Sequence, residues 1–472
     1  DLKPLPNNTA RLDLTKVVPA CPTTAPRRQY TVHAITARGN LPGGRLVYNQ
    51  KYGLYDPDAL LFVKAEHLAA VRSGARRPEP LILRAAAGDC VEVKLVNELP
   101  TQFSRSPHWN YVTPIIDGFN TNQVPMSSQV SLHPQLLQYD VNRGDGANVG
   151  YNSVQTVAPG QSRTYQWYAG RYEKTTLSSG INILDWTVQA LLAAADFKLT
   201  DQGGNTLLFE GKPVELGAVN LRDMADVITH GMHGAVGTLI VEPQGATWST
   251  DPGTEAQATV TYKTRSGATT SFREFVLVYQ DEIALHSDRP QFQSNDPSLN
   301  GGTALRNLID ASDAADVGHK GFNYRTEPLW ARLGLPPHAS QGTVNDQQLG
   351  DIFNSRVHGD PETPVFTVKA GMPYRFRVVQ PSGHARQHAF TLHGAEWIHD
   401  AWADGSGSDW LGTNTKSCTM GTQDGMSVMK AWNFTPLYGA GGANAVPGDY
   451  MYRDQPAAML ADGLWGIVRV QP

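Results

Sequence analysis

Cysteine is scarce in this sequence, whose 472 residues contain three: Cys21, Cys90 and Cys418. Three cysteines close at most one intrachain bridge, so the chain is not a disulfide-stapled framework. Cys21 and Cys90 lie in the same N-terminal region and either pair in an oxidising compartment or stay buried as free thiols. The sequence begins at Asp1 rather than Met, through a removed leader or a trimmed start. We expect the leader, and with it a secreted or periplasmic protein.

Long apolar runs and an excess of one charge are also missing. No stretch approaches the ~18–20 apolar residues of a membrane-spanning helix. The formal net charge of −5 is small for this length, so nothing favours nucleic acid or an acidic membrane as a partner. Gly-x-Ser-x-Gly and His-Glu-x-x-His motifs do not occur, which leaves little support for a hydrolase. We therefore expect no membrane span and no nucleic-acid partner.

Strand signals dominate what the sequence does contain. Glycine (45) and proline (31) are plentiful, as in chains of short strands joined by turns. Segments such as "QYTVHAI", "AQATVTYKT" and "LWGIVRVQP" mix β-branched and aromatic residues with a period of two. Only 185–199 reads as a helix, with a second one expected after a short strand within 56–74. The pattern predicts an all-β protein with short inserted helices.

The chain also repeats itself. Three pairs of segments recur in the same order: Ala86–Asn97 with Lys369–Gln380, Ser131–Pro134 with Thr391–Gly394, and Gly234–Pro243 with Gly463–Pro472. We therefore predict two homologous β-sandwich domains, residues 29–250 and 251–472, after an N-terminal extension of residues 1–28. The first unit is about 54 residues longer than the second, which we assign to an insertion at about 171–220.

Each half places a histidine at the same strand end, His133 in "VSLHP" and His393 in "HAFTLHG". If the domains pack about a pseudo-twofold axis, these two imidazoles face each other across the interface. Histidines held by two rigid sandwiches are a sound basis for a metal site. The alternative is that both make structural hydrogen bonds.

With these features the sequence resembles the multicopper oxidases, which are built from cupredoxin-fold domains. The resemblance covers roughly residues 29–472, and its motifs occur in the family's order: "GDCVEVKLVNELP", "VSLHP", "VAPGQSRTYQWYAG", "HGMHGAVGTLIVEP", "FREFVLVYQDE", "HAFTLHGAEW" and "DGLWGIVRV". It implies two cupredoxin-like Greek-key sandwiches, a copper cofactor, O₂ as a co-substrate, and a homo-oligomer, by analogy a trimer.

The copper ligands of the family are largely replaced. Of its four His-x-His pairs, only His133 and His393 remain, with Gln135 and Thr391 at the positions of their partners. His388 matches the first ligand of the blue copper site, but Cys418 does not match the position of its cysteine. The fourth pair is expected in "GDYMYRD", where Tyr450, Met451 and Tyr452 stand instead.

The residues that remain define the candidate site. As metal ligands we predict His133, His393 and His388, together with His230 and His233, whose His-x-x-His spacing is a weaker signal. Tyr450 and Tyr452 point to one face of a strand, where they act as redox or proton-transfer groups or fill the space of the lost imidazoles. Met420 and Met451 supply soft ligands for Cu(I) or pack in the core.

Two functions follow. The first is a copper-dependent oxidoreductase with a reduced, atypical copper site that oxidises a specific small molecule with O₂. The second is a non-catalytic cupredoxin-fold protein that binds copper or a partner. The loss of most ligands argues against broad laccase activity and favours a specialised reaction.

Overall fold

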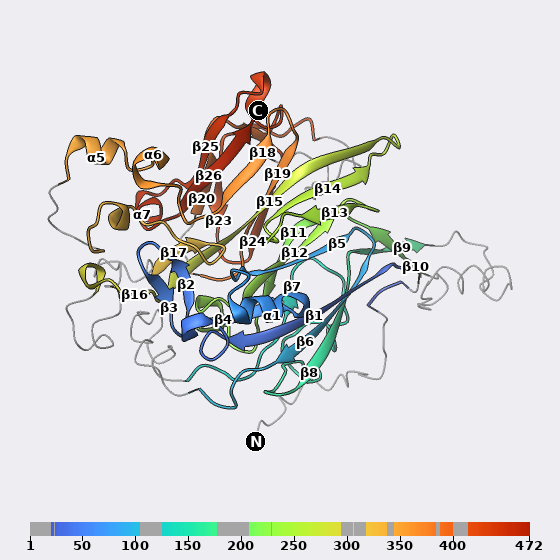
Figure 1. Ribbon diagram of the computed structural model, residues 1–472. Helices are drawn as coiled ribbons and strands as arrows, with labels where there is room; N and C mark the ends of the chain where they lie inside the picture. Colours follow the sequence, from blue (N-terminus) through green and yellow to red (C-terminus); the bar gives the residue numbers. More distant parts are fainter. Residues whose placement is uncertain are drawn as a thin grey trace, which may run out of the picture.

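The computed structural model shows strands from two stretches of the chain forming two adjoining β-sandwiches (Figure 1). It describes residues 20–22, 24–103, 125–176, 207–227, 229–293, 305, 318–337, 344–383, 388–399 and 414–472. The all-β class predicted from the sequence is confirmed.

The first sandwich contains two four-stranded sheets. One has the spatial order β4 (Leu60–Lys64), β1 (Arg27–Thr36), β6 (Cys90–Asn97) and β8 (Ser162–Tyr168). The other has the order β5 (Leu81–Ala86), β12 (Val236–Glu242), β11 (Gly217–Arg222) and β7 (His133–Pro134). In β6 the alternate residues Val91, Val93 and Leu95 are fully buried between the sheets, because side chains at every second position of a strand share a face.

The second sandwich repeats this plan with longer sheets. One has the order β13 (Thr247–Thr250), β14 (Gln257–Lys263), β15 (Thr269–Ile283), β19 (Tyr374–Gln380) and β24 (Lys430–Phe434), with β17 (His319–Phe322) paired to β15. The other has the order β18 (Val365–Lys369), β26 (Trp465–Gln471), β25 (Gly448–Asp454), β20 (His388–Leu392) and β23 (Thr422–Met426). Since β13 pairs with β14, the second sandwich begins at Thr247, a few residues before the boundary expected at residue 251.

Strand pairing is equivalent in the two halves. The parallel pair β1–β6 corresponds to β15–β19, and the parallel pair β5–β12 corresponds to β18–β26. Likewise the antiparallel pair β7–β11 corresponds to β20–β25. The predicted repeat of cupredoxin-like sandwiches is therefore confirmed at the level of topology, and it makes the "VSLHP" and "HAFTLHG" strands equivalent.

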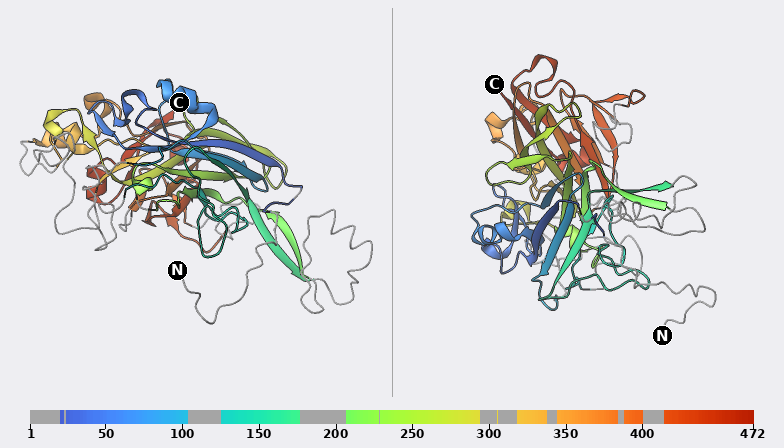
Figure 2. Two further views of the ribbon diagram at one scale, coloured as in Figure 1. Left: turned by 90° about the horizontal axis from the view of Figure 1, so that it is seen from below. Right: turned by 90° about the vertical axis from the view of Figure 1, so that its right-hand side faces the viewer.

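A two-stranded ribbon, β9 (Gly170–Thr176) with β10 (Leu207–Pro213), extends away from the first sandwich (Figure 2). It occupies the ends of the insertion predicted at about 171–220. Residues 217–220, however, belong to β11 in the sandwich itself. The helix predicted at 185–199 lies outside the described residues.

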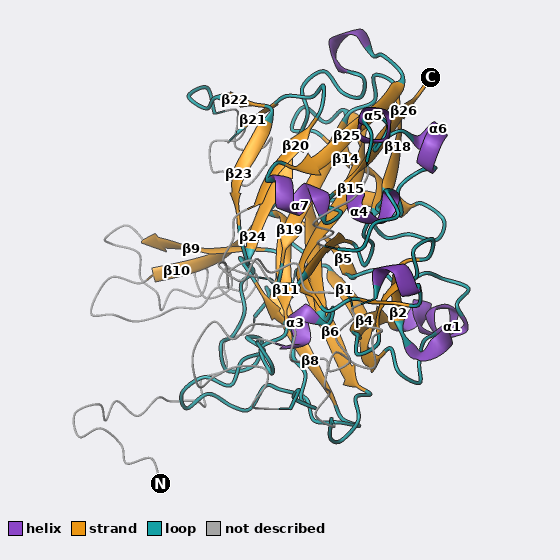
Figure 3. Cartoon of the chain, turned by 90° about the vertical axis from the view of Figure 1, so that its left-hand side faces the viewer, coloured by secondary structure: helices purple, strands orange, loops and turns teal. Residues whose placement is uncertain are grey.

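The helices of the described chain are short and lie at the edges of the sheets (Figure 3). They are α1 (Ala65–Ser73), α3 (Thr229–Met232), α4 (Leu329–Arg332), α5 (Asp346–Gly350), α6 (Ser355–His358) and α7 (Ala457–Ala461). The helix expected within 56–74 is α1, preceded by the short strand β4. Smaller strands are β2 (Leu46–Asn49), β3 (Leu54–Asp56), β16 (His286–Ser287), β21 (Trp397–Ile398) and β22 (Thr419–Met420).

The two sandwiches meet where β11 packs against β19 and β24. Nearby, a fully buried ion-pair cluster joins them. Glu274 accepts hydrogen bonds from Arg84 Nη2 at 2.9 Å and from Arg377 Nε at 2.9 Å, and Arg377 Nη2 lies 3.2 Å from Glu242. Arg84 and Glu242 come from the first sandwich and the other two from the second. The cluster therefore holds the two sandwiches together.

Candidate functional site

His388 begins β20 and is the residue that sequence analysis places at the first blue-copper position. Its side chain is fully buried between two carboxylates. Nδ1 hydrogen-bonds Asp454, and Nε2 lies 3.3 Å from Asp281 Oδ2. Burial alone would lower the pKa of the imidazole, but the hydrogen bonds to Asp281 and Asp454 raise it to about 9. At neutral pH His388 is therefore an imidazolium with both ring nitrogens protonated.

The carboxylate of Asp281 beside His388 is itself held ionised. Burial would raise the pKa of Asp281, but Lys320 Nζ at 2.7 Å and the imidazole of His388 hold it well below its usual range. Asp454 also accepts a hydrogen bond from the backbone N–H of Ala389 at 2.8 Å. Asp281, Asp454, His388 and Lys320 thus form a buried, mutually paired group inside the second sandwich.

This arrangement does not suit copper at His388. A metal needs a ring nitrogen with an available lone pair, and the usual ligand histidine keeps one nitrogen for the metal while the other donates to an outer partner. Here both nitrogens face carboxylates. Sequence analysis did not identify Asp281 or Asp454 as partners, although both stand within quoted motifs, "FREFVLVYQDE" and "GDYMYRD".

His230 and His233 on α3 show the same pattern. His230 Nδ1 hydrogen-bonds Asp223, and its Nε2 lies 2.7 Å from the carbonyl oxygen of Ser127. Burial lowers the pKa of His230, but the charge of Asp223 outweighs this and raises it. His233 Nδ1 lies 2.9 Å from Asp56, and that carboxylate raises the pKa of His233 to about 9 in spite of burial. Their His-x-x-His spacing therefore serves two separate ion pairs.

His133 is the exception. It lies on β7, opposite Arg222 of β11, and remains partly exposed. Its Nδ1 lies 2.8 Å from the backbone carbonyl of Asp145 and 3.1 Å from the carboxylate of the same residue. This orientation fixes Nδ1 as the donor and directs Nε2 away from that partner, which is the arrangement of a ligand histidine. The neighbouring Gln135 accepts a hydrogen bond from Asn220 at 2.9 Å.

His393 follows directly after β20 and is exposed. Its Nε2 accepts a hydrogen bond from Arg453 Nε at 3.2 Å. Partial burial and the charge of Arg453 both lower the pKa of the ring. A neutral imidazole suits a metal, but the guanidinium next to it repels a cation. Thr391, where the family has a histidine, forms a hydroxyl–hydroxyl hydrogen bond of 2.8 Å with Thr422.

The two tyrosines of β25 have different environments. Tyr452 is fully buried among aromatic rings, and its hydroxyl donates to the carbonyl of Pro364 at 2.6 Å. Tyr450 is half-buried and donates to the carbonyl of Val446 at 2.8 Å. Both hydroxyls are thus engaged with backbone oxygens, and packing is the role that these contacts describe.

The predicted ligands do not converge on one point in the described structure. The interface between the sandwiches includes β11 against β19 and β24, and α3 against β15, whereas β20 belongs to the other sheet of the second sandwich. That His133 and His393 face each other across that interface therefore stays a prediction. Sequence equivalence of the two strands is real, but it does not determine which sheets pack together.

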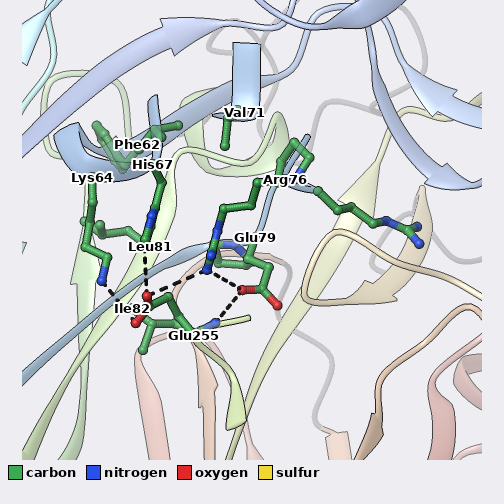
Figure 4. Close-up of a pocket in the computed structure, with 13 residues that line it drawn as sticks. Phe62, Lys64, His67, Val71, Arg76, Glu79, Leu81, Ile82 and Glu255 are labelled. Carbon is green, nitrogen blue, oxygen red and sulfur yellow. Dashed lines mark hydrogen bonds and ion pairs between the residues drawn. The ribbon is translucent and has the colours of Figure 1, made fainter. Parts of the chain in front are cut away.

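Among the described residues, the side chains Glu66, His67 and Glu255 do converge as metal ligands would. His67 and Glu255 also line a surface pocket between α1, β5 and the start of the second sandwich (Figure 4). Glu255 is already engaged, however, by Lys64 Nζ at 3.0 Å and Arg76 Nη2 at 3.7 Å, and His67 Nε2 lies 2.8 Å from its carboxylate. The two cations lie where a metal ion would compete with them, so these contacts describe a structural ion-pair network. Sequence patterns do not reveal it because Glu255 is 188 residues from His67.

Comparisons with known proteins were made against families, sequences and structures. No family model and no curated protein sequence matches the chain. Among the similar solved structures is a multicopper oxidase, with a TM-score of 0.42 and 12% identity over 94% of this chain and 88% of that chain. Another is the copper nitrite reductase from Nitrosomonas europaea, with a TM-score of 0.45 and 13% identity over 94% of each chain. A further one is the Blue Copper Oxidase from Nitrosomonas europaea, with a TM-score of 0.43 and 13% identity over 94% of this chain and 86% of that chain. No helix among the described residues is long and apolar enough to cross a membrane.

Proposed function

We propose that this chain is a cupredoxin-like module of copper-oxidoreductase descent in which ion pairs have replaced copper ligation at the ancestral positions. The observation that carries the proposal is the position of His388 between Asp454 and Asp281. Copper binding there would require removal of a proton from an imidazole whose pKa is about 9, and it would break two buried ion pairs. The module then acts by binding a partner or carrying copper elsewhere, without laccase-type turnover.

A second candidate is the copper-dependent oxidase with a reduced site. The observation that favours it is His133, whose Nδ1 is held by Asp145 while Nε2 is directed away from that partner. Copper bound there would supply one-electron chemistry toward O₂ and a small organic substrate. His133 would hold the metal, Asp145 would fix its tautomer, and Tyr139, whose ring contacts His133 at a centroid distance of 6.2 Å, would form one wall.

Copper loading separates the two. The protein is expressed with copper, dialysed, and examined by metal analysis, electron paramagnetic resonance and O₂ consumption with phenol and diamine substrates. We expect no stoichiometric Cu(II) and no O₂ uptake. One equivalent of Cu(II) that is lost in His133→Ala but kept in His358→Gln, together with O₂ uptake, would establish the second candidate and overturn the first.

We also propose that the protein works in an oxidising compartment. Cys21 and Cys90 form a disulfide with a Cα–Cα distance of 5.6 Å, a bond that persists in secreted and periplasmic proteins. The trimer implied by the resemblance is a separate proposal, for which light scattering of the purified chain provides the test.

A further inference from the structure

A thiol and a thioether lie side by side at the edge of the second sandwich. Cys418 Sγ lies 3.8 Å from Met420 Sδ, and the thiol is solvent-exposed. The two residues are separated by one position along an extended segment, so their side chains share a face. Two sulfurs at this distance subtend an angle of about 110° at an ion about 2.3 Å from each, which is close to tetrahedral.

An imidazole belongs to the same face. The short strands β21 and β22 pair with Trp397 opposite Met420, and the register continues with a hydrogen bond of 3.0 Å from the backbone N–H of His399 to the carbonyl of Cys418. Residues directly opposite in such a pair have Cβ atoms about 5 Å apart. The strand register therefore places His399 directly opposite Cys418, on the face that Cys418 and Met420 share.

The surroundings of the three donors are apolar on one side and open on the other. Trp397 is 1% exposed and lies opposite Met420 across the strand pair, and the ring of His399 contacts Trp432 at a centroid distance of 5.8 Å. A hydrophobic backing lowers the local dielectric around a metal and restricts its exchange with water. The exposed thiol leaves the opposite side accessible to an incoming ion.

We propose that Cys418, Met420 and His399 form a binding site for a soft d¹⁰ cation, Cu(I) or its analogue Ag(I). Thiolate and thioether ligands select Cu(I) over harder ions, and imidazole is compatible with it. The thiol loses its proton on binding, so the site carries one negative charge that offsets the charge of the cation. This site is separate from the ancestral copper positions, and its occupation does not depend on the outcome at His388 or His133.

The test is an anaerobic titration of the fully reduced chain with Cu(I) in competition with a chromogenic Cu(I) chelator, repeated with Ag(I). We expect one equivalent in the wild type. Cys418→Ser is expected to weaken binding on the order of 100-fold, and Met420→Leu and His399→Gln about tenfold. Met372→Leu and His358→Gln provide the matched thioether and imidazole controls, with affinity unchanged.

Two results would overturn the site. If Cys418→Ser binds as tightly as the wild type, the metal lies elsewhere. If Met420→Leu and His399→Gln both equal their controls while Cys418→Ser loses binding, the thiol acts alone and there is no built site. Far-ultraviolet circular dichroism and the Tm of each variant establish that the fold is intact, as expected for substitutions at this exposed edge.

Discussion

The imidazole Nε2 of His388 lies 3.3 Å from the carboxylate of Asp281, inside the core of the second sandwich. The opposite ring nitrogen hydrogen-bonds Asp454. This pairing makes a residue in a ligand position a cation at neutral pH. It also makes the stability of the fold depend on pH.

Stability should decline as the pH rises from about 6.5 to 9. The pKa of His388 is about 9 in the folded chain, against 6.5 for a free imidazole. Because the folded pKa is the higher one, the contribution of the ion pair is complete below pH 6.5 and is lost as the pH rises through 9. The loss is at most about 3 kcal/mol for His388. His233, whose pKa is also about 9, adds to it. Urea unfolding between pH 6 and 10 measures the decline.

A pair of variants assigns the pH effect to the residue. His388→Gln should reduce the slope between pH 6.5 and 9 to the part that His233 contributes, and lower the free energy of unfolding at pH 7 by about 3–5 kcal/mol, since two buried carboxylates lose their partner. His393→Gln should keep the wild-type slope, because its folded pKa lies below 6.5. An unchanged slope in His388→Gln would rule out the imidazolium.

The interface cluster provides a second prediction, from two buried glutamates with opposite roles. Burial and the neighbouring carboxylate of Glu274 raise the pKa of Glu242 well above its usual range, which favours the neutral form of this side chain. Burial acts in the same direction on Glu274, but Arg84 and Arg377 lower its pKa to about 2. Glu274→Gln should therefore cost about 3–5 kcal/mol, and Glu242→Gln less than about 1 kcal/mol.

Chemical denaturation of both variants at pH 7 gives the comparison. The substitutions are isosteric and affect the same cluster, so each is the control for the other. Equal losses would show that both glutamates are ionised. A larger loss for Glu242→Gln would reverse the assignment of charge.

Much of the fold was predictable because its signals are local. The period-two alternation of segments such as Cys90–Asn97 reports a half-buried strand directly. The repeated motifs then identified β7 and β20 as equivalent, and strand pairing bears this out. The helix α1 was also predictable from the sequence, because its residues do not alternate between apolar and polar as the strand residues do.

The site was less predictable because it depends on distant residues. Asp281 and Asp454 lie 107 and 66 residues from His388, and no local pattern indicates that they flank it. The protonation state of the ring follows from that placement and from burial. Similarly, equivalence of His133 and His393 says nothing about which faces of the sandwiches meet. A histidine pattern therefore identified the positions but not their chemistry.

The disulfide provides a third prediction. Cys21 and Cys90, for which both the bridged and the free state were considered, are bridged and span 69 residues. Closing a loop of that length stabilises the folded chain by about 4 kcal/mol in the chain-entropy account. Cys21→Ser should lower the free energy of unfolding by about 2–4 kcal/mol, whereas Cys418→Ser should leave it unchanged. Alkylation of the unfolded chain without reduction should modify one thiol, that of Cys418. After reduction it should modify all three thiols. Modification of three thiols before reduction would contradict the bridge.

The last prediction separates packing from catalysis at the tyrosines of β25. The hydroxyl of Tyr452 donates to Pro364 at 2.6 Å, and a Cβ on Gly466 would lie 2.2 Å from that hydroxyl. Tyr452→Phe should cost about 1–2 kcal/mol by leaving a buried carbonyl unpaired. Gly466→Ala should cost more because the ring must shift in a packed core. Tyr450→Phe, at a half-buried position, should cost less than either.

Thermal unfolding of the three variants ranks these costs, and O₂ uptake by copper-loaded protein is measured on the same samples. If the tyrosines have a structural role, the loss of stability should be largest for Gly466→Ala, smaller for Tyr452→Phe and smallest for Tyr450→Phe. Any O₂ uptake should then change only in proportion to the folded fraction. If the tyrosines have a redox role, Tyr450→Phe or Tyr452→Phe should instead abolish O₂ uptake while the chain remains folded. The buried hydrogen bond of Tyr452 favours the first outcome, since a hydroxyl donating to a backbone carbonyl inside an aromatic cluster has no path to an external substrate.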